Sequence, residues 1–224
     1  MQIVDSSSSS YSVVEGHRDC YELMHWLARG EKNPLRDRLI PRLREGRVSM
    51  VVYAIGGDSI AHSRAREQRL LATLENLRLF KKCIADTGSS VVLTSRDVPT
   101  EHEVTDPKFV LHLEGGLPLT GSLEALETFH ELGVRSLQPT WNLRNELGDG
   151  VHESESGGGL SRFGRDAVRL AQELAMIVDL AHASESTFWD IMRVTTGPVI
   201  VSHANARAVH DHRTSGDPHD VPER

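Results

Sequence analysis

Val48-Ser-Met-Val-Val-Tyr-Ala-Ile55 and Phe109-Val-Leu-His-Leu-Glu114 are short apolar runs rich in β-branched and aromatic residues, and they predict buried strands. Four other runs predict strands on the same grounds: Val13–His17, Val134–Thr140, Met176–His182 and Pro198–His203. Longer stretches with a helical period separate most of these runs. Such an alternation is typical of repeated βα units around a parallel sheet, so we expect the α/β class.

The predicted helices follow from apolar residues that recur at steps of three and four. One such stripe consists of Leu70, Leu74, Leu77, Phe80 and Ile84, and it ends near Gly88. Further helices are expected from a Ser122 cap to Gly133, from Leu160 to Leu174, and from Ser184 to Val194. These stripes predict packing against the sheet rather than a functional surface.

The composition excludes several classes of protein. The chain has 224 residues, 38% hydrophobic and 25% charged, which excludes disorder, collagen and coiled coils. Its 25 basic and 32 acidic residues give a net charge of -7, and since no basic block stands out we expect no nucleic-acid partner. No long apolar run or secretory signal is present, and Cys20 and Cys83 lie far apart, so we expect a cytoplasmic protein without a membrane partner.

Histidine is overrepresented, with 12 residues against 11 aromatic ones. Four predicted strands end in a metal-ligating residue: His17, with Asp19 just beyond it, Glu114, His182 and His203. In α/β barrels the carboxyl ends of the strands meet at one reactive face. A histidine at one strand end is more often structural, but recurrence at four ends favours a site for zinc or a similar divalent ion.

The same residues carry a resemblance to a known family. Its D-G-H-x-D motif corresponds to Glu15-Gly16-His17-Arg18-Asp19, and its E-G-G motif to Glu114-Gly115-Gly116. The further matches are Gly159–Gly164 (Gly-Leu-Ser-Arg-Phe-Gly), Val178–His182 and Pro198–Arg207. From Val13 to His212 the chain resembles the renal (membrane) dipeptidase family of zinc peptidases, a branch of the metal-dependent hydrolase barrels.

The resemblance implies a binuclear zinc centre and a dipeptide substrate. His17 and Asp19 would hold one ion and His182 and His203 the other, while Glu114, the catalytic carboxylate, would bridge both. A hydroxide between the ions would attack the peptide bond, because bound metal lowers the pKa of water to about 7.

Two substrate-binding residues depart from the family pattern. Trp141 stands where the mammalian enzymes have a histidine, and it is either an N–H donor to the developing oxyanion or an aromatic wall. Arg213 lies one residue out of register with the family's basic residue for the substrate carboxylate. It is either that ligand or a surface charge in the tail.

The end of the chain limits the expected barrel. Arg224 comes before the family's last two strands and its final aspartate ligand, which predicts a C-terminally truncated TIM-barrel-like (β/α) fold with about six of eight units. We expect a flexible segment at 1–12, the partial barrel at 13–212 and a polar tail without a strand or helix period at 213–224. The expected activity is zinc-dependent dipeptide hydrolysis, and the alternative is an inactive relative that still binds metal. A second copy of the chain, forming a homodimer, is a further partner to consider.

Overall fold

The computed structural model describes residues 13–99, 106–206 and 220–221. Its main sheet is parallel throughout and runs in the order β1-β2-β4-β5-β6-β7, with β3 beside the start of β4. The strands are β1 (Val13–Asp19), β2 (Val48–Gly57), β3 (Ser90–Val91), β4 (Lys108–Glu114), β5 (Val134–Gln138), β6 (Ile177–Asp179) and β7 (Val199–Ile200). All six predicted strands are present, so the prediction of an incomplete βα barrel with six main strands is confirmed.

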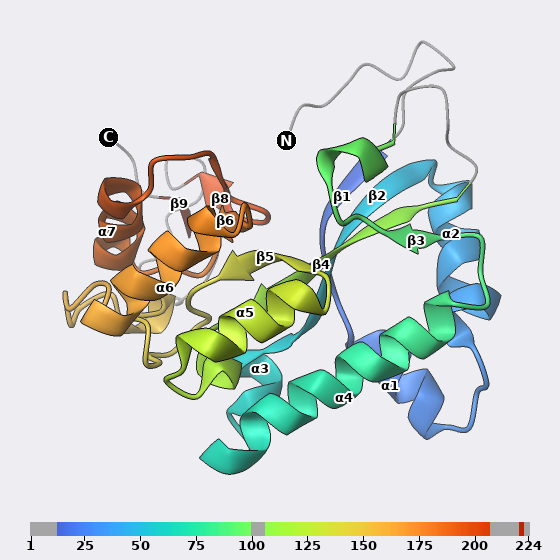
Figure 1. Cartoon of the computed structure of the whole chain (residues 1–224), viewed down its shortest axis with the longest axis horizontal. Helices are drawn as coiled ribbons and strands as arrows, with labels where there is room; N and C mark the ends of the chain where they lie inside the picture. The colour runs from blue at the N-terminus through green and yellow to red at the C-terminus, as the bar shows by residue number, and fades with distance from the viewer. Residues whose placement is uncertain (1–12, 100–105, 207–219, 222–224) are drawn as a thin grey trace.

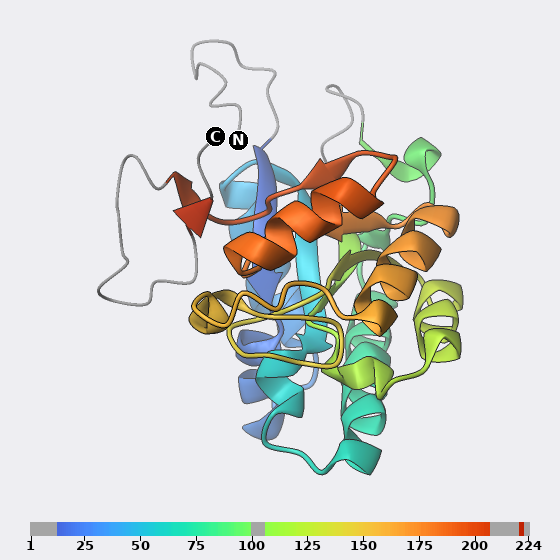
Figure 2. The same ribbon diagram turned by 90° about the vertical axis from the view of Figure 1, so that its left-hand side faces the viewer.

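Helices follow the strands and cover the outer face of the curled sheet (Figures 1 and 2). They are α1 (Tyr21–Ala28), α2 (Ile40–Glu45), α3 (Asp58–Ala61), α4 (Arg66–Ile84), α5 (Leu123–Glu131), α6 (Arg162–Glu173) and α7 (Glu185–Val194). The four predicted helices correspond to α4, α5, α6 and α7. In the described part of the chain, no helix combines the length and the apolar character needed to cross a bilayer.

The two faces of β4 have different neighbours because side chains alternate along a strand. Phe109, Leu111 and Leu113 belong to the main apolar core beneath the helices. There Phe109 and Phe80 of α4 have ring centroids 5.4 Å apart, and each buried Phe side chain stabilises the fold by about 1.5–3 kcal/mol. His112 and Glu114 occupy the alternate positions, so the polar side chains of the strand face the inside of the curl.

Serine side chains begin three of the covering helices. The Ser122 hydroxyl accepts a hydrogen bond from the Ala125 amide at 3.3 Å, as the sequence predicts for α5. Ser161 and Ser184 cap α6 and α7 in the same way. Each cap satisfies an amide that the first helical turn leaves free and is worth about 1 kcal/mol.

The last two strands of the main sheet, β6 and β7, are shorter than predicted. β6 ends at Asp179 and β7 at Ile200, so His182 and His203 lie in loops beyond the strand ends. His182 has a φ of 60°, which is incompatible with an extended strand. The connecting segments after the two strands therefore include Leu180, Ala181 and Ser202, although the sequence pattern there resembles that of a strand.

One short strand lies in the tail, where the sequence has no strand or helix period. Asp220–Val221 forms β9, which pairs with β8 (Asn205–Ala206) apart from the main sheet (Figure 2). A two-residue strand needs only backbone hydrogen bonds and leaves no hydropathy period in the sequence. The predicted flexible segment at 1–12 and most of the tail, with Arg213, lie outside the described residues.

Candidate metal centre

Four of the five predicted metal ligands meet at the carboxyl end of the sheet. Glu114, the last residue of β4, is 5% exposed, and three imidazole nitrogens surround its Oε1 atom. The distances from Oε1 are 3.0 Å to Nε2 of His17, 3.7 Å to Nε2 of His182 and 3.9 Å to Nε2 of His203. β1, β4 and the loops after β6 and β7 thus each contribute one side chain.

The donor set suits a divalent transition metal. Imidazole nitrogen and carboxylate oxygen are zinc ligands, and one ligand atom from each of His17, Glu114 and His203 lies within 4.8 Å of the other two. The Nε2 atoms of His182 and His203 face each other at 2.8 Å. Two imidazole nitrogens that converge beside a buried carboxylate form a site at which a cation fits.

The outer nitrogens of two histidines are held by neighbouring side chains. Nδ1 of His182 lies 2.8 Å from Oδ1 of Asn142, and because an amide oxygen only accepts, Nδ1 carries the proton and Nε2 keeps its lone pair. Nδ1 of His203 lies 2.7 Å from the Ser202 hydroxyl. Such partners orient the ring of a metal-ligating histidine.

The electrostatics favour positive charge at this place. Burial lowers the pKa of His17, but the hydrogen bond with Glu114 and its charge outweigh that effect, and the pKa lies above its usual value. The charges of Asp19 and Asp179 act in the same direction. A field that favours a proton on His17 also favours a metal cation that replaces the proton.

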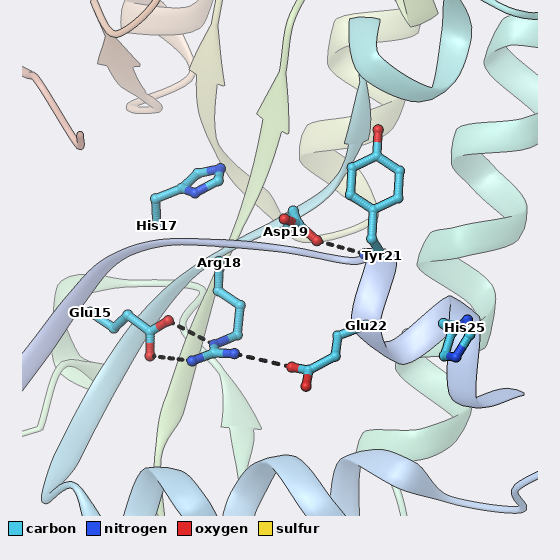
Figure 3. Close-up of a pocket in the computed structure, with 7 residues that line it drawn as sticks. All are labelled: Glu15, His17, Arg18, Asp19, Tyr21, Glu22 and His25. Carbon is cyan, nitrogen blue, oxygen red and sulfur yellow. Dashed lines mark hydrogen bonds and ion pairs between the residues drawn. The ribbon is translucent and has the colours of Figure 1, made fainter. Parts of the chain in front are cut away.

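Asp19, the fifth predicted ligand, lies at the end of β1 on the same side of the strand as His17 (Figure 3). Its Oδ1 atom accepts a hydrogen bond from the Tyr21 amide at 2.7 Å, and its carboxylate lies outside the compact ligand group. Both residues line an open pocket of about 570 Å³, and Arg18 extends to the other side of the strand toward Glu15 and Glu22 (Figure 3). The structure therefore places Asp19 beside the centre.

Trp141 lies next to the histidine group. Its ring centroid is 5.9 Å from that of His182, and the side chain is half-buried in the loop after β5. This position is compatible with both predicted roles, the N–H donor and the aromatic wall.

Sequence reasoning missed several polar residues beneath the centre. His112 is completely buried, with Nδ1 2.9 Å from the Ser136 hydroxyl and Nε2 3.9 Å from Asp179. Burial lowers the pKa of His112 and keeps its ring neutral. Asp179 is also completely buried, three residues before His182. In the sequence, each of these two residues could have been noticed as a polar residue in an otherwise apolar strand.

Cys20 directly follows Asp19 but is no nucleophile. Burial and the charge of Asp19 raise the pKa of its thiol to about 12, so the thiol is protonated at neutral pH. This agrees with the expectation that the chemistry needs no protein nucleophile.

Comparison with known proteins finds relatives among the dipeptidases. Human Dipeptidase 3 is 27% identical over 217 residues, which cover 90% of this chain and 43% of the human protein. A Klebsiella pneumoniae protein, described as uncharacterized and in the pqqA 5' region, is 32% identical over 142 residues, 60% of this chain and 52% of that protein. The chain thus spans about half the length of these relatives.

Two solved structures share the fold. Dipeptidase AC, a metallopeptidase of family M19, superposes with a TM-score of 0.77 at 25% identity, covering 90% of this chain and 65% of that chain. A Rhodobacter sphaeroides metallopeptidase, liganded with a phosphinate mimic of the dipeptide L-Ala-D-Ala, gives 0.76 at 25% identity, with 90% and 67% covered. Residues 4–220 match the family model described as Membrane dipeptidase (Peptidase family M19). The chain belongs to the membrane dipeptidase family.

Proposed function

We propose that this protein is a zinc-dependent dipeptidase with a binuclear centre. His17 and Asp19 would hold one ion and His182 and His203 the other, with Glu114 between them. The observation that carries the proposal is the convergence of three imidazole Nε2 atoms within 3.9 Å of one buried Glu114 oxygen. The family match supports peptide-bond hydrolysis as the reaction.

The protein side chains prepare this site for a cation and a small substrate. Bound zinc would supply a Lewis acid and a hydroxide nucleophile at neutral pH. Glu114 contributes negative charge in a buried place where charge interactions are strong, and Asn142 keeps the lone pair of His182 on Nε2. The high pKa of the Cys20 thiol keeps that side chain neutral, and the nucleophile would be an activated water.

The substrate would occupy the space beside His17 and Asp19. Trp141 would border the substrate next to His182, and Arg213 would bind its carboxylate. Because the Rhodobacter sphaeroides relative was solved with a mimic of L-Ala-D-Ala, we expect alanine dipeptides with either configuration of the second residue to be suitable substrates.

The test is hydrolysis of L-Ala-L-Ala and L-Ala-D-Ala by the zinc-loaded protein and by Glu114→Gln. We expect the variant to lose turnover to background, because the neutral amide contributes no charge to the centre and is a poorer ligand. Glu75→Gln is the matched control, since Glu75 is exposed on α4 and pairs with Arg78. Full activity in Glu114→Gln would refute the proposal, and zinc binding without turnover of any dipeptide would support the inactive, metal-binding alternative.

A further inference from the structure

Asp179 links the two loops that carry His182 and His203. It is the last residue of β6, and its side chain is completely buried. Its Oδ1 atom accepts hydrogen bonds from the amides of Ala181 and Ser202, both at 3.1 Å. Each of these amides belongs to the residue immediately before a histidine of the centre, so one oxygen atom determines how both histidine backbones leave the sheet.

The carboxylate acts where the backbone pairing of β6 with β7 ends. The last backbone bond at this end joins the Leu180 amide to the Ile200 carbonyl at 2.9 Å. Beyond it the chain turns sharply, and His182 adopts the left-handed φ of 60°. An aspartate that accepts from the amide two residues later stabilises this kind of turn. Asp179 thus joins the two segments that follow β6 and β7, beyond the last backbone hydrogen bond between the strands.

The second oxygen of Asp179 makes its carboxylate costly to bury. Oδ2 is buried without a hydrogen-bond partner among the described residues, 3.9 Å from Nε2 of His112. Burying a carboxylate with one unsatisfied oxygen is costly, so the hydrogen bonds from the Ala181 and Ser202 amides to Oδ1 are what stabilise the side chain at this position.

We propose that Asp179 is a positioning residue that sets the spacing of His182 and His203. By holding Ala181 and Ser202, it brings the two Nε2 atoms to 2.8 Å from each other beside Glu114. The inference rests on the proposed metal centre and adds a residue that touches no ligand atom of that centre. It predicts that loss of Asp179 has a larger effect on metal binding than on the rest of the fold.

The experiment compares wild type with Asp179→Leu, Asp179→Asn and Asn33→Ala. Leu replaces the carboxylate with an apolar group of similar shape, and Asn keeps one oxygen that accepts less strongly than a carboxylate. Asn33 is the matched control, because it is also buried and bonded to two backbone groups, the Cys83 carbonyl and the Arg36 amide. For each protein, Zn²⁺ affinity is measured by competition with a chelating indicator, the visible spectrum with bound Co²⁺, and thermal unfolding without metal.

We expect Asp179→Leu to bind Zn²⁺ about 10- to 100-fold more weakly, the usual effect of removing a residue that orients metal ligands, and to change the Co²⁺ spectrum. Asp179→Asn should show a smaller change in the same direction. Asn33→Ala should lose thermal stability and keep the affinity and the spectrum of the wild type.

Wild-type Zn²⁺ affinity and an unaltered Co²⁺ spectrum in Asp179→Leu would overturn the inference. If that variant does not fold, the same results in Asp179→Asn would overturn it. A wild-type protein that binds no Zn²⁺ would instead refute the proposed metal centre itself, so the two failures are distinguishable.

Discussion

Asp58 is a buried carboxyl group that joins two loops at the same end of the sheet as the metal centre. Its Oδ1 atom accepts from the Leu117 amide at 2.7 Å, in the loop after β4. Its Oδ2 atom accepts from the Asn145 side chain at 2.8 Å, in the loop after β5. Burial raises the pKa of Asp58 to about 7 although these hydrogen bonds lower it. A single side chain therefore makes the stability of both loops dependent on pH.

The raised pKa of Asp58 predicts that stability falls as the pH rises. Between the ordinary value of 3.8 and about 7, the unfolded chain releases the proton and the folded chain keeps it. The free energy of unfolding of the wild type, relative to that of Asp58→Asn, should thus be highest below pH 4. It should decrease by up to about 4 kcal/mol as the pH reaches 7.

Urea unfolding at steps from pH 4 to 8, with EDTA to remove metal, checks this prediction. Referring each value to Asp58→Asn removes the contribution of other titrating groups. A difference between the two proteins that stays constant over this range would contradict it.

At the scale of elements, the end of β2 is shaped by its close approach to β4. Gly57 pairs with Glu114 and has a φ of 152°, and a Cβ atom there would lie only 1.8 Å from the Glu114 carbonyl oxygen. We expect Gly57→Ala to lower the free energy of unfolding by about 3 kcal/mol, the sum of overpacking and backbone strain. It should also weaken Zn²⁺ binding, because Glu114 has to move.

Gly30→Ala is the matched control for this prediction. Gly30 also has a positive φ, of 87°, but apart from its chain neighbours no atom of the described residues lies within 4 Å of the position that a Cβ atom would occupy there, so only the backbone strain of about 1 kcal/mol applies. Urea unfolding and Zn²⁺ titration of both variants separate the two effects. Equal losses in the two variants would show that the approach of β2 to β4 tolerates a side chain.

At the scale of the whole molecule, the centre joins the two ends of the sheet. His17 belongs to β1 at one end of the strand order, and His203 follows β7 at the other. Their ring centroids are 4.2 Å apart, and a Cβ atom on Gly16 would lie 2.6 Å from the Ser202 carbonyl oxygen. The described strand order does not pair β1 with β7, so the two ions of the proposed centre, one on His17 and one on His203 with Glu114 between them, would connect them.

This arrangement predicts that zinc stabilises the entire fold. At a free concentration 100 times its Kd, each bound Zn²⁺ ion should raise the free energy of unfolding by about 2.7 kcal/mol. His203→Ala should lose most of this gain, and His130→Ala on α5 should keep it. Urea unfolding with Zn²⁺ and with EDTA measures the difference. The same zinc effect in His203→Ala as in the wild type would contradict a role of His203 in the centre.

Much of the architecture could be predicted from local patterns. The stripe from Leu70 to Ile84 and the Ser122 cap predicted α4 and α5, because helical period and capping depend on residues close in sequence. The lengths of β6 and β7 could not be predicted in this way. Beyond the strand ends the Asp179 carboxylate bonds to Ser202, 23 residues away, and no hydropathy pattern records that contact.

The sequence by itself determined the fold class, the six main strand segments and which ligand types stand near their ends. It did so because strand alternation and the parallel βα pattern bring distant residues to one face regardless of detail. Only the tertiary structure decided that His112 and Asp179 are buried beneath that face, that Asn142 holds His182, and that Asp19 stands beside the compact ligand group. Burial and hydrogen-bond partners arise from segments far apart in the chain, and they become defined when those segments pack.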